Sequence, residues 1–339
     1  MGALKAVVFR FVRVGRQAFC RWRFASLTWF QAAYSSSRFC AFALRPTMLV
    51  AHITDPHLSL DTWALPGHPG PAQALRNALR HVQAIDPVPE VLLLTGDLTE
   101  SGAEADFRTL RQVLDETLPS PQAGGPLVLA VLGNHDDRAT AQAVLGHLLG
   151  PAAHGAATGP EDGGTTPPAP PAPPAGLTSL HTEYGGLHFI GLDTMVPGRP
   201  HGELDDAQLD WLAATLALCA GQPVMIFMHH PPLTSGMAAM DACGLLRGRE
   251  RLAELVRAHG GVQLIAAGHM HRGIVGALGG APVVVAPSCS HQLALDLRPQ
   301  GGLAVQMEPP QVGLYRWTPQ DGLACHFSHV QAYPGPFPV

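Results

Sequence analysis

The sequence predicts an α/β layered domain, and three observations support this fold class. Short apolar segments with the length of β-strands recur from Met48 onward. Segments with helical spacing of apolar residues lie between them, an alternation typical of domains in which helices cover β-sheets. The chain has 339 residues, 46% of them hydrophobic, which is enough to bury a sizeable core.

The expected strands and helices follow from the length of the apolar segments and from the helical spacing of apolar residues between them. Seven short apolar segments are predicted as strands: Leu49–Thr54, Val91–Thr95, Leu127–Leu132, Leu187–Leu192, Val224–Met228, Val262–Ala267 and Pro282–Ala286. Four helices are predicted between them, around Leu75/Leu79/Val82, Phe107/Leu110/Leu114, Leu209/Leu212/Leu216 and Leu252/Leu255/Val256. Near the C-terminus, Gln311–Trp317 and Leu323–Val330 flank a turn-forming segment, so we expect a hairpin that extends one edge of a sheet.

Residues 1–47 differ in composition from the rest of the chain. They carry eight Lys or Arg side chains and no Asp or Glu, together with many aromatic residues. We interpret them as an extension outside the fold, produced by assigning the start codon upstream of Met48. A targeting or membrane-surface segment is the main alternative, and a folded role is a further one. Residues 48–339 are expected to form the catalytic domain.

A second unusual segment, residues 150–176, lies inside that domain. Of its 27 residues, 21 are Pro, Ala or Gly, and it has no periodic apolar face. Such a composition is typical of a flexible surface insertion. We expect no catalytic residue there.

Composition narrows the class of function. The formal net charge is -5, and because residues 1–47 are basic, the remainder is clearly acidic, which argues against a nucleic acid polymer as partner. The six cysteines include no C-x-x-C pair, so neither a disulfide framework nor a structural zinc module is indicated. No apolar run is long enough for a transmembrane helix. We therefore expect a soluble, cytoplasmic protein that acts on small molecules and that could form a homo-oligomer.

Polar metal-ligand residue types stand at the ends of five predicted strands. Asp55 and His57 follow the first strand, and Asp97 follows the second after a glycine that lets the backbone turn. Asn134 and His135, in Gly-Asn-His-Asp-Asp, follow the third. Each motif alone is weak evidence for a metal site, because the same residue types often occur in turns and helix caps.

Histidines complete the set. His229 follows the strand Val224–Met228 and precedes two prolines, while His269 and His271 follow Val262–Ala267 at positions i and i+2 of an extended segment. Two carboxylates, four imidazoles and one amide form a ligand set suited to Fe, Mn, Zn or Co. Their number suits two divalent or trivalent ions sharing one carboxylate, an arrangement typical of phosphate-ester hydrolysis.

The order D-x-H, G-D-x-x-x-x-G, G-N-H-D, H-H, G-H-x-H resembles the calcineurin-like metallophosphoesterase superfamily across Leu49–Gln292. The resemblance implies a four-layer α/β/β/α sandwich. It also implies two metal sites that share Asp97, and between two such ions we expect a metal-bridging hydroxide as nucleophile. The first site would consist of Asp55, His57, Asp97 and His271, and the second of Asp97, Asn134, His229 and His269.

Finer resemblance favours phosphodiesters. The segments Gly133–Arg138, His229–Pro232, Met240–Leu245 and Pro287–Gln292 are similar to those of class III cyclic nucleotide phosphodiesterases and glycerophosphodiesterases. A 3′,5′-cyclic nucleotide such as cAMP, or a glycerophosphodiester, is therefore the expected substrate. The alternatives are a phosphomonoesterase of the same superfamily and a non-catalytic scaffold.

Further residues are assigned roles near the ligands. His135 is the candidate catalytic group, which would stabilise the phosphoryl group or protonate the leaving oxygen; a supporting hydrogen bond to a ligand is its alternative role. Asn134, His135 and His201 are candidate substrate-binding residues, although for His201 an ordinary loop histidine is the favoured alternative. Asp136 is expected to orient an imidazole or to cap the following helix.

Overall fold

The computed structural model describes residues 47–59, 68–120, 123–149, 171–335 and 337. Residues 1–46 of the predicted extension and residues 150–170 of the predicted insertion lie outside the described part. Within that part, no helix has both the length and the apolar character needed to cross a bilayer.

Two β-sheets form the centre of the fold. The first has the strand order β15-β14-β1-β2-β3 and consists of β1 (Met48–Ile53), β2 (Val91–Thr95), β3 (Leu127–Val131), β14 (Gln311–Thr318) and β15 (Gly322–His329). The second has the order β10-β11-β9-β7-β5-β4 and consists of β4 (Leu180–Tyr184), β5 (Leu187–Leu192), β7 (Val224–Met228), β9 (Val262–Ala267), β10 (Ile274–Leu278) and β11 (Ala281–Val285). Two short pairs lie outside these sheets: β6 (Gly202–Glu203) with β8 (Leu245–Arg247), and β12 (Gln292–Leu293) with β13 (Val305–Gln306).

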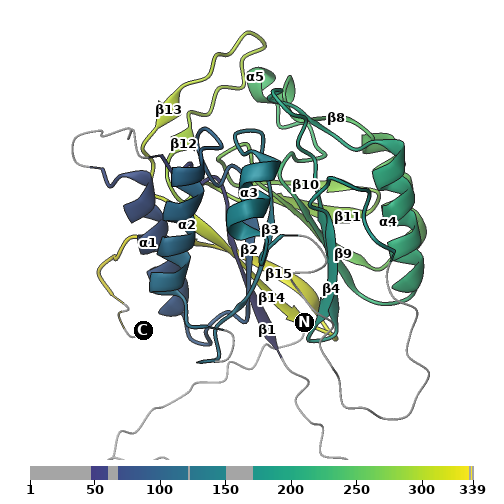
Figure 1. The fold of residues 1–339 in the computed structure, drawn as a ribbon, viewed down its shortest axis with the longest axis horizontal. Helices are drawn as coiled ribbons and strands as arrows, with labels where there is room; N and C mark the ends of the chain where they lie inside the picture. Colours follow the sequence, from purple (N-terminus) through teal and green to yellow (C-terminus); the bar gives the residue numbers. More distant parts are fainter. Residues whose placement is uncertain (1–46, 60–67, 121–122, 150–170, 336, 338–339) are drawn as a thin grey trace, which may run out of the picture. The chain divides into compact units, whose positions relative to one another are not determined.

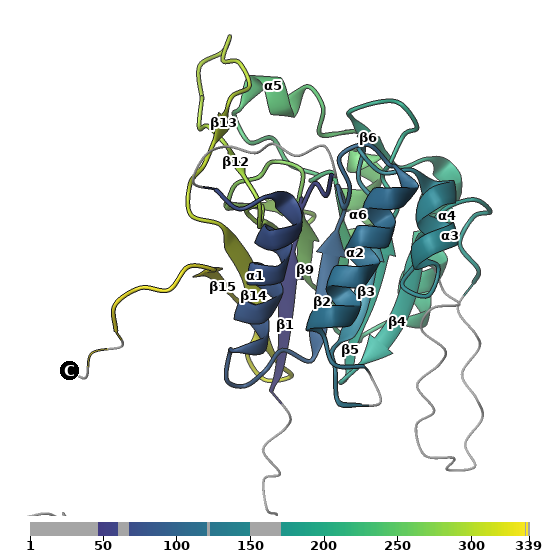
Figure 2. The same ribbon diagram turned by 60° about the vertical axis from the view of Figure 1, so that its left-hand side comes forward.

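Helices cover the outer face of each sheet (Figures 1 and 2). The helices α1 (Pro71–Gln83), α2 (Glu104–Thr117) and α3 (Arg138–Leu145) share a core with the first sheet. The helices α4 (Asp206–Leu218) and α6 (Arg249–His259) share one with the second, and the short α5 (Ala238–Asp241) contributes Met240 to it. The layers are therefore α/β/β/α, and the predicted four-layer sandwich is confirmed.

Alternation along the strands divides the apolar residues among three cores. In β1, Val50 faces the core between the two sheets, whereas Ala51 faces α1 and α2. In β2, Leu93 faces the core between the two sheets, and Leu94 faces the helices. Because both faces are covered, all five residues of β2 are buried, which explains why the strand has a continuous apolar sequence.

The central strands of both sheets are parallel, and this arrangement determines where the polar residues that follow the strands lie. Strand β2 pairs in parallel with β1 and β3, and in the second sheet β7 pairs in parallel with β5 and β9. Parallel neighbours bring their carboxyl ends to one edge of a sheet, so the segments that follow them converge.

All seven predicted strands are present, with bounds within one residue of those expected, and the predicted hairpin forms β14 and β15 at an edge of the first sheet. The edge strands β4 and β10 were not predicted, and the helix α3 was expected only as the helix that follows Asp136, without bounds. Strand β4 is Leu-His-Thr-Glu-Tyr, with only its first residue buried, so it lacks an apolar run.

Candidate metal centre

Five of the seven predicted ligands have a left-handed backbone conformation. Their φ angles lie between 45° and 70°, although none is glycine: Asp55, His57, Asp97, His269 and His271. Each follows a strand end. Residues other than glycine in this region cost about 1–3 kcal/mol each and are concentrated at functional sites. The backbone therefore turns sharply to aim these side chains into one space.

The first predicted ligand group is assembled in the structure. Candidate ligand atoms of Asp55, His57, Asp97 and His271 lie within 4.8 Å of one another, and all four residues are buried. Nε2 of His57 lies 3.1 Å from Nε2 of His271 and 3.6 Å from Oδ2 of Asp97. Nε2 of His271 lies 3.4 Å from Oδ1 of Asp55.

The second group surrounds Nε2 of His229. This atom lies 3.3 Å from Oδ1 of Asp97, 3.2 Å from Oδ1 of Asn134 and 3.3 Å from Nδ1 of His269. The two oxygens of Asp97 therefore face different groups, Oδ2 toward His57 and Oδ1 toward His229. A carboxylate in this position can bridge two cations.

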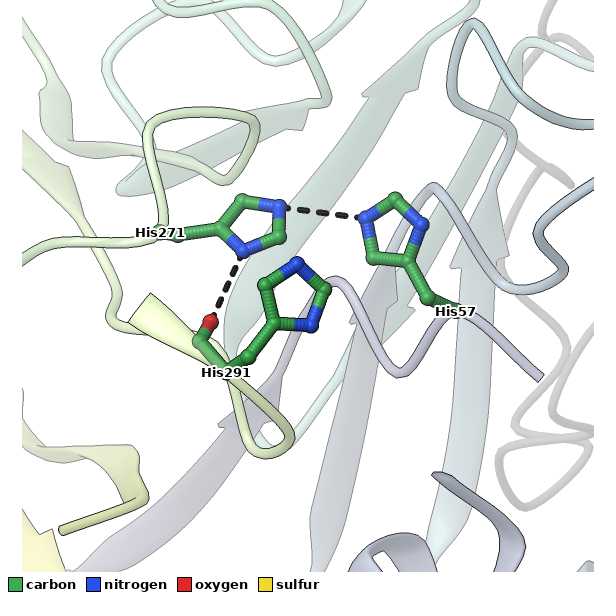
Figure 3. Close-up of side chains that lie close together, drawn as sticks. All are labelled: His57, His271 and His291. Carbon is green, nitrogen blue, oxygen red and sulfur yellow. Dashed lines mark hydrogen bonds between the residues drawn. The ribbon is translucent and has the colours of Figure 1, made fainter. Parts of the chain in front are cut away.

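Three of the histidines are oriented by hydrogen bonds on their outer side. Nδ1 of His57 donates to Oε2 of Glu100 at 2.7 Å. Nδ1 of His229 donates to the Thr95 carbonyl at 2.7 Å, and Nδ1 of His271 donates to the His291 carbonyl at 2.8 Å. Figure 3 shows one ring nitrogen of His271 directed toward His57 and the other toward the carbonyl of His291. A neutral ring held in this way presents an unprotonated nitrogen inward, as metal-ligating histidines do.

Hydrogen bonds also fix the carboxylates. The Thr54 hydroxyl donates to Oδ2 of Asp55 at 2.7 Å, and the backbone amide of His269 donates to the same oxygen at 3.0 Å. Oδ1 of Asp97 accepts from the backbone amide of His135 at 2.9 Å. Both oxygens of Asp55 and one oxygen of Asp97 therefore accept hydrogen bonds, which hold the two carboxylates in place.

The electrostatics of the site favour positive charge. Burial raises the pKa of Asp97, but the adjacent His229 and His57 outweigh burial and hold this pKa well below its usual range. Burial lowers the pKa of His229, whereas Asp97 and Asp55 raise it, with a net increase to about 9. In the absence of cations, protons on imidazole therefore neutralise the buried carboxylates.

The donor set fits transition-metal ions. Nε2 of His269 is buried without a hydrogen-bond partner among the described residues, while Nδ1 of the same ring faces His229. Burial and the neighbouring His229 lower the pKa of His269 to about 3, so its ring is neutral and available as a ligand. Imidazole and carboxylate donors around one small space suit Zn, Mn, Fe or Co.

Glycine makes the close packing of this centre possible. A Cβ atom on Gly133 would lie 2.2 Å from Oδ1 of Asp97 and 2.8 Å from Nε2 of His229. A Cβ on Gly268 would lie 2.8 Å from Oδ2 of Asp55. The glycines of the G-N-H-D and G-H-x-H motifs thus allow the backbone to approach the ligands.

Comparison with known proteins agrees with this geometry. The family model of the calcineurin-like phosphoesterases matches residues 48–273, which include all seven candidate ligands. The chain belongs to this family. Proteins of the family use divalent metals and hydrolyse phosphate esters, so the chain is a phosphoesterase.

Two relatives and one solved structure illustrate the similarity. A probable glycerophosphodiester phosphodiesterase, GpdQ, of Arcobacter nitrofigilis is 29% identical over 86% of this chain and 96% of its own length. A probable cyclic nucleotide phosphodiesterase of Rhodococcus erythropolis is 31% identical over 76% of each protein. The purple acid phosphatase PPD1 from yellow lupin seeds shares the fold, with a TM-score of 0.54 and 15% identity, over 85% of this chain and 53% of its own.

The phosphoesterase centre has His135 at its rim. Nδ1 of this residue donates to the Glu100 carbonyl at 2.8 Å, and its ring lies 4.8 Å from that of His57. Burial lowers the pKa of His135, but Asp97 and the hydrogen bond to Glu100 outweigh it and raise the pKa. The side chain is 37% exposed, so it contacts both the ligand groups and solvent.

His201 is not joined to the centre. Its Nε2 lies 3.3 Å from Oε1 of Glu203, and within the described residues no hydrogen bond or ion pair connects it to a candidate ligand. Its predicted role in substrate binding is not tested by these contacts.

Asp136 has a role different from the two expected. Its carboxylate accepts hydrogen bonds from the backbone amides of Leu98, Thr99 and Gly133. It therefore joins the loop after β2 to the loop after β3. The cap of α3 is the neighbouring Asp137, whose side chain accepts from the amide of Thr140.

Sequence reasoning missed three residues beside the centre. Glu100 orients His57, His230 groups with His229 and His269, and His291 lies with its ring 4.6 Å from that of His271 (Figure 3). The signal for His291 was present, because it follows the predicted strand at 282–286 just as the ligands follow theirs. Glu100 lies three residues after Asp97 in the same loop.

Proposed function

We propose that this phosphoesterase hydrolyses phosphodiesters, either a 3′,5′-cyclic nucleotide or a glycerophosphodiester, with two transition-metal ions. The observation that carries the proposal is the division of the Asp97 carboxylate between two groups of ligand atoms. One ion would be held by Asp55, His57, Asp97 and His271, and the other by Asp97, Asn134, His229 and His269. Iron and manganese are the metals that we expect first.

The ions, when bound, supply the Lewis acidity that activates water and neutralises charge on the phosphoryl group. The side chains prepare the space for that chemistry. Glu100, Thr95 and His291 hold three imidazoles in one tautomer, and Thr54 holds Asp55. Fixed ligands of this kind need little reorganisation during the reaction.

His135 is the proton donor in this proposal. Its Nδ1 hydrogen is engaged by the Glu100 carbonyl, so Nε2 is the nitrogen available to a substrate. Because Asp97 and Glu100 raise its pKa, the ring holds a second proton more readily than an ordinary histidine. A positioned imidazolium can protonate the leaving oxygen, which typically contributes about 10²–10⁴-fold.

The preference for diesters rests on relatives. Both relatives described above are named as phosphodiesterases, one for glycerophosphodiesters and one for cyclic nucleotides. A third, from Mycobacterium tuberculosis, is named as a cAMP/cGMP dual specificity phosphodiesterase. The chain spans at least 72% of the length of each of the three.

A substrate panel tests the proposal. Protein loaded separately with Mn²⁺, Fe²⁺, Zn²⁺ or Co²⁺ is assayed on cAMP, cGMP, glycerophosphodiesters, bis(p-nitrophenyl) phosphate and p-nitrophenyl phosphate. We expect a higher kcat/KM for at least one diester than for the monoester, and loss of activity in Asn134→Ala. Faster hydrolysis of the monoester would make the protein a phosphomonoesterase, and absence of turnover with every metal would leave a non-catalytic scaffold.

A further inference from the structure

A second cluster of metal-ligand residues lies away from the phosphoesterase centre. His181 of β4, His188 of β5 and Cys219, which caps the C-terminus of α4, bring candidate ligand atoms within 4.8 Å of one another. His188 lies opposite Val224 in the register of β5 and β7, and His229 follows that residue by five positions. At about 3.3 Å per residue, the cluster is roughly 17 Å from the binuclear centre.

The strand register places both histidines on one face of the sheet. In the antiparallel pair β4 and β5, His181 lies opposite Ile190 and His188 lies opposite Glu183. The two histidines are diagonal neighbours on the face that carries Ile190, which is the face covered by α4. Cys219 enters the same space from the end of α4 and is 1% exposed.

Two distances within the cluster are close to those around one tetrahedral ion. Nε2 of His181 lies 3.1 Å from Nδ1 of His188 and 3.5 Å from Sγ of Cys219. Zinc bonds of about 2.0–2.1 Å to nitrogen and 2.3 Å to sulfur at tetrahedral angles separate two nitrogens by about 3.4 Å, and nitrogen from sulfur by about 3.6 Å.

The surroundings prepare these atoms as ligands. Nε2 of His188 donates to Oε1 of Gln222 at 2.7 Å, which leaves Nδ1 of that ring unprotonated and directed at His181. Nε2 of His259 donates to the Cys219 carbonyl at 2.9 Å and fixes the backbone that carries the thiol. The C-terminus of α4 adds the negative end of a helix dipole, which favours a cation.

We propose that His181, His188 and Cys219 bind one divalent ion of the zinc or cobalt type, separate from the phosphoesterase centre. The fourth position would be filled by water. On binding, the thiol releases its proton to solvent, and the proton on Nε2 of His181 moves to Nδ1, an atom that is buried without a partner in the described structure. No local sequence pattern indicates this site, because its ligands come from three elements without a recognisable spacing.

Burial raises the pKa of the Cys219 thiol to about 11, so without a metal it is protonated at neutral pH. Burial and the neighbouring His188 lower the pKa of His181 to about 4, so this ring is neutral. A neutral imidazole needs no deprotonation to ligate, and metal coordination deprotonates a thiol.

Cobalt substitution tests the proposal by spectroscopy. The full chain is stripped with a chelator, titrated with Co²⁺, and examined for a thiolate-to-cobalt charge-transfer band in the near ultraviolet and for cobalt per chain. The ligands proposed for the binuclear centre include no sulfur, so the band reports a cysteine ligand, and its loss in Cys219→Ser assigns that ligand to Cys219. We expect the band in the wild type, with one more cobalt per chain than in Cys219→Ser, which loses the band and keeps phosphoesterase activity.

Matched variants make each outcome decisive. Cys325→Ser removes an exposed thiol and should keep the band. His188→Gln should weaken cobalt binding at this site at least tenfold. This variant replaces Cys219→Ser as the test of the site if Cys219→Ser does not fold. Asp97→Ala should abolish turnover and keep the band, which separates this site from the proposed function. Absence of the band in the wild type, its persistence in Cys219→Ser, or its loss in Cys289→Ser would overturn the proposal.

Discussion

The carboxylate of Asp136 accepts hydrogen bonds from both the backbone amide and the hydroxyl of Thr99, at 2.9 Å and 3.0 Å. This contact joins the loop that carries Asp97 to the loop that carries Asn134. Burial, together with the nearby Asp97, raises the pKa of Asp136 to about 6. The charge of this side chain is costly to bury, and the hydrogen bonds that it accepts from the two loops offset that cost.

Replacement of Asp136 by alanine should loosen the metal centre. Three buried backbone amides would lose their acceptor, so we expect a loss of stability of about 1–3 kcal/mol and metal affinity about 10–100-fold weaker. Metal titration and chemical denaturation measure the two effects. Asp137→Ala is the control, because it removes the cap of α3 and should cost about 0.5–2 kcal/mol of stability without weakening metal binding. Equal metal affinities in the two variants would contradict this role.

Replacement of His135 by alanine should lower kcat and leave metal content unchanged. The expected loss is about 10²–10⁴-fold on substrates with a poor leaving group, and smaller on p-nitrophenyl esters, whose leaving group needs no proton. Asn134→Ala differs because it removes a candidate ligand and should lower metal content as well. Steady-state kinetics and metal analysis separate the two. An equal loss on good and poor leaving groups would exclude proton donation by His135.

Addition of one methyl group at Gly133 should disrupt the site. The new Cβ in Gly133→Ala would lie 2.2 Å from Oδ1 of Asp97, so the carboxylate must move. A displacement on the order of 1 Å can cost about 10²-fold in rate. Gly302→Ala is the matched control, since its Cβ would meet nothing within 4 Å. If kcat/KM were the same in both variants, close packing at Gly133 would have no catalytic importance.

The ion pair of Arg138 with the buried Asp193 should be important for stability. Nε and Nη2 of Arg138 donate to the two oxygens of Asp193 at 2.8 Å and 2.9 Å, and the Asp193 side chain is fully buried. Arg138→Ala would leave this charge without its partner, at a cost of about 3–5 kcal/mol. The exposed pair of Arg108 and Glu104 provides the comparison, because Arg108→Ala should change stability by about 1 kcal/mol or less. Urea denaturation would show whether the two losses differ as expected.

The strands and the candidate ligands were predictable because each has a local signal. A buried parallel strand is a short apolar run, and a polar residue directly after it lies at the edge of the sheet. The segments Val224–Met228 and His229 are one example, and Val262–Ala267 and His269 are another. The two-sheet arrangement came from resemblance to a family, since periodicity alone does not say how many sheets the strands form.

Other features could not be predicted from local sequence. The cluster of His181, His188 and Cys219 depends on strand register and on where α4 ends, neither of which the spacing of these residues contains. The left-handed conformation of Asp55 is likewise imposed by tertiary contacts, because aspartate adopts it only occasionally. The role of Asp136 depends on two loops that are adjacent only in the folded chain.

The division of the candidate ligands between the two sheets has a consequence for how the protein matures. Asp55 follows the first strand, and His271 follows β9, so 215 residues separate them in the chain. A ribosome must release most of the polypeptide before the second residue is available. Metal capture at the proposed centre would therefore follow the docking of the two halves, and a bound metal pair would indicate that both halves have folded.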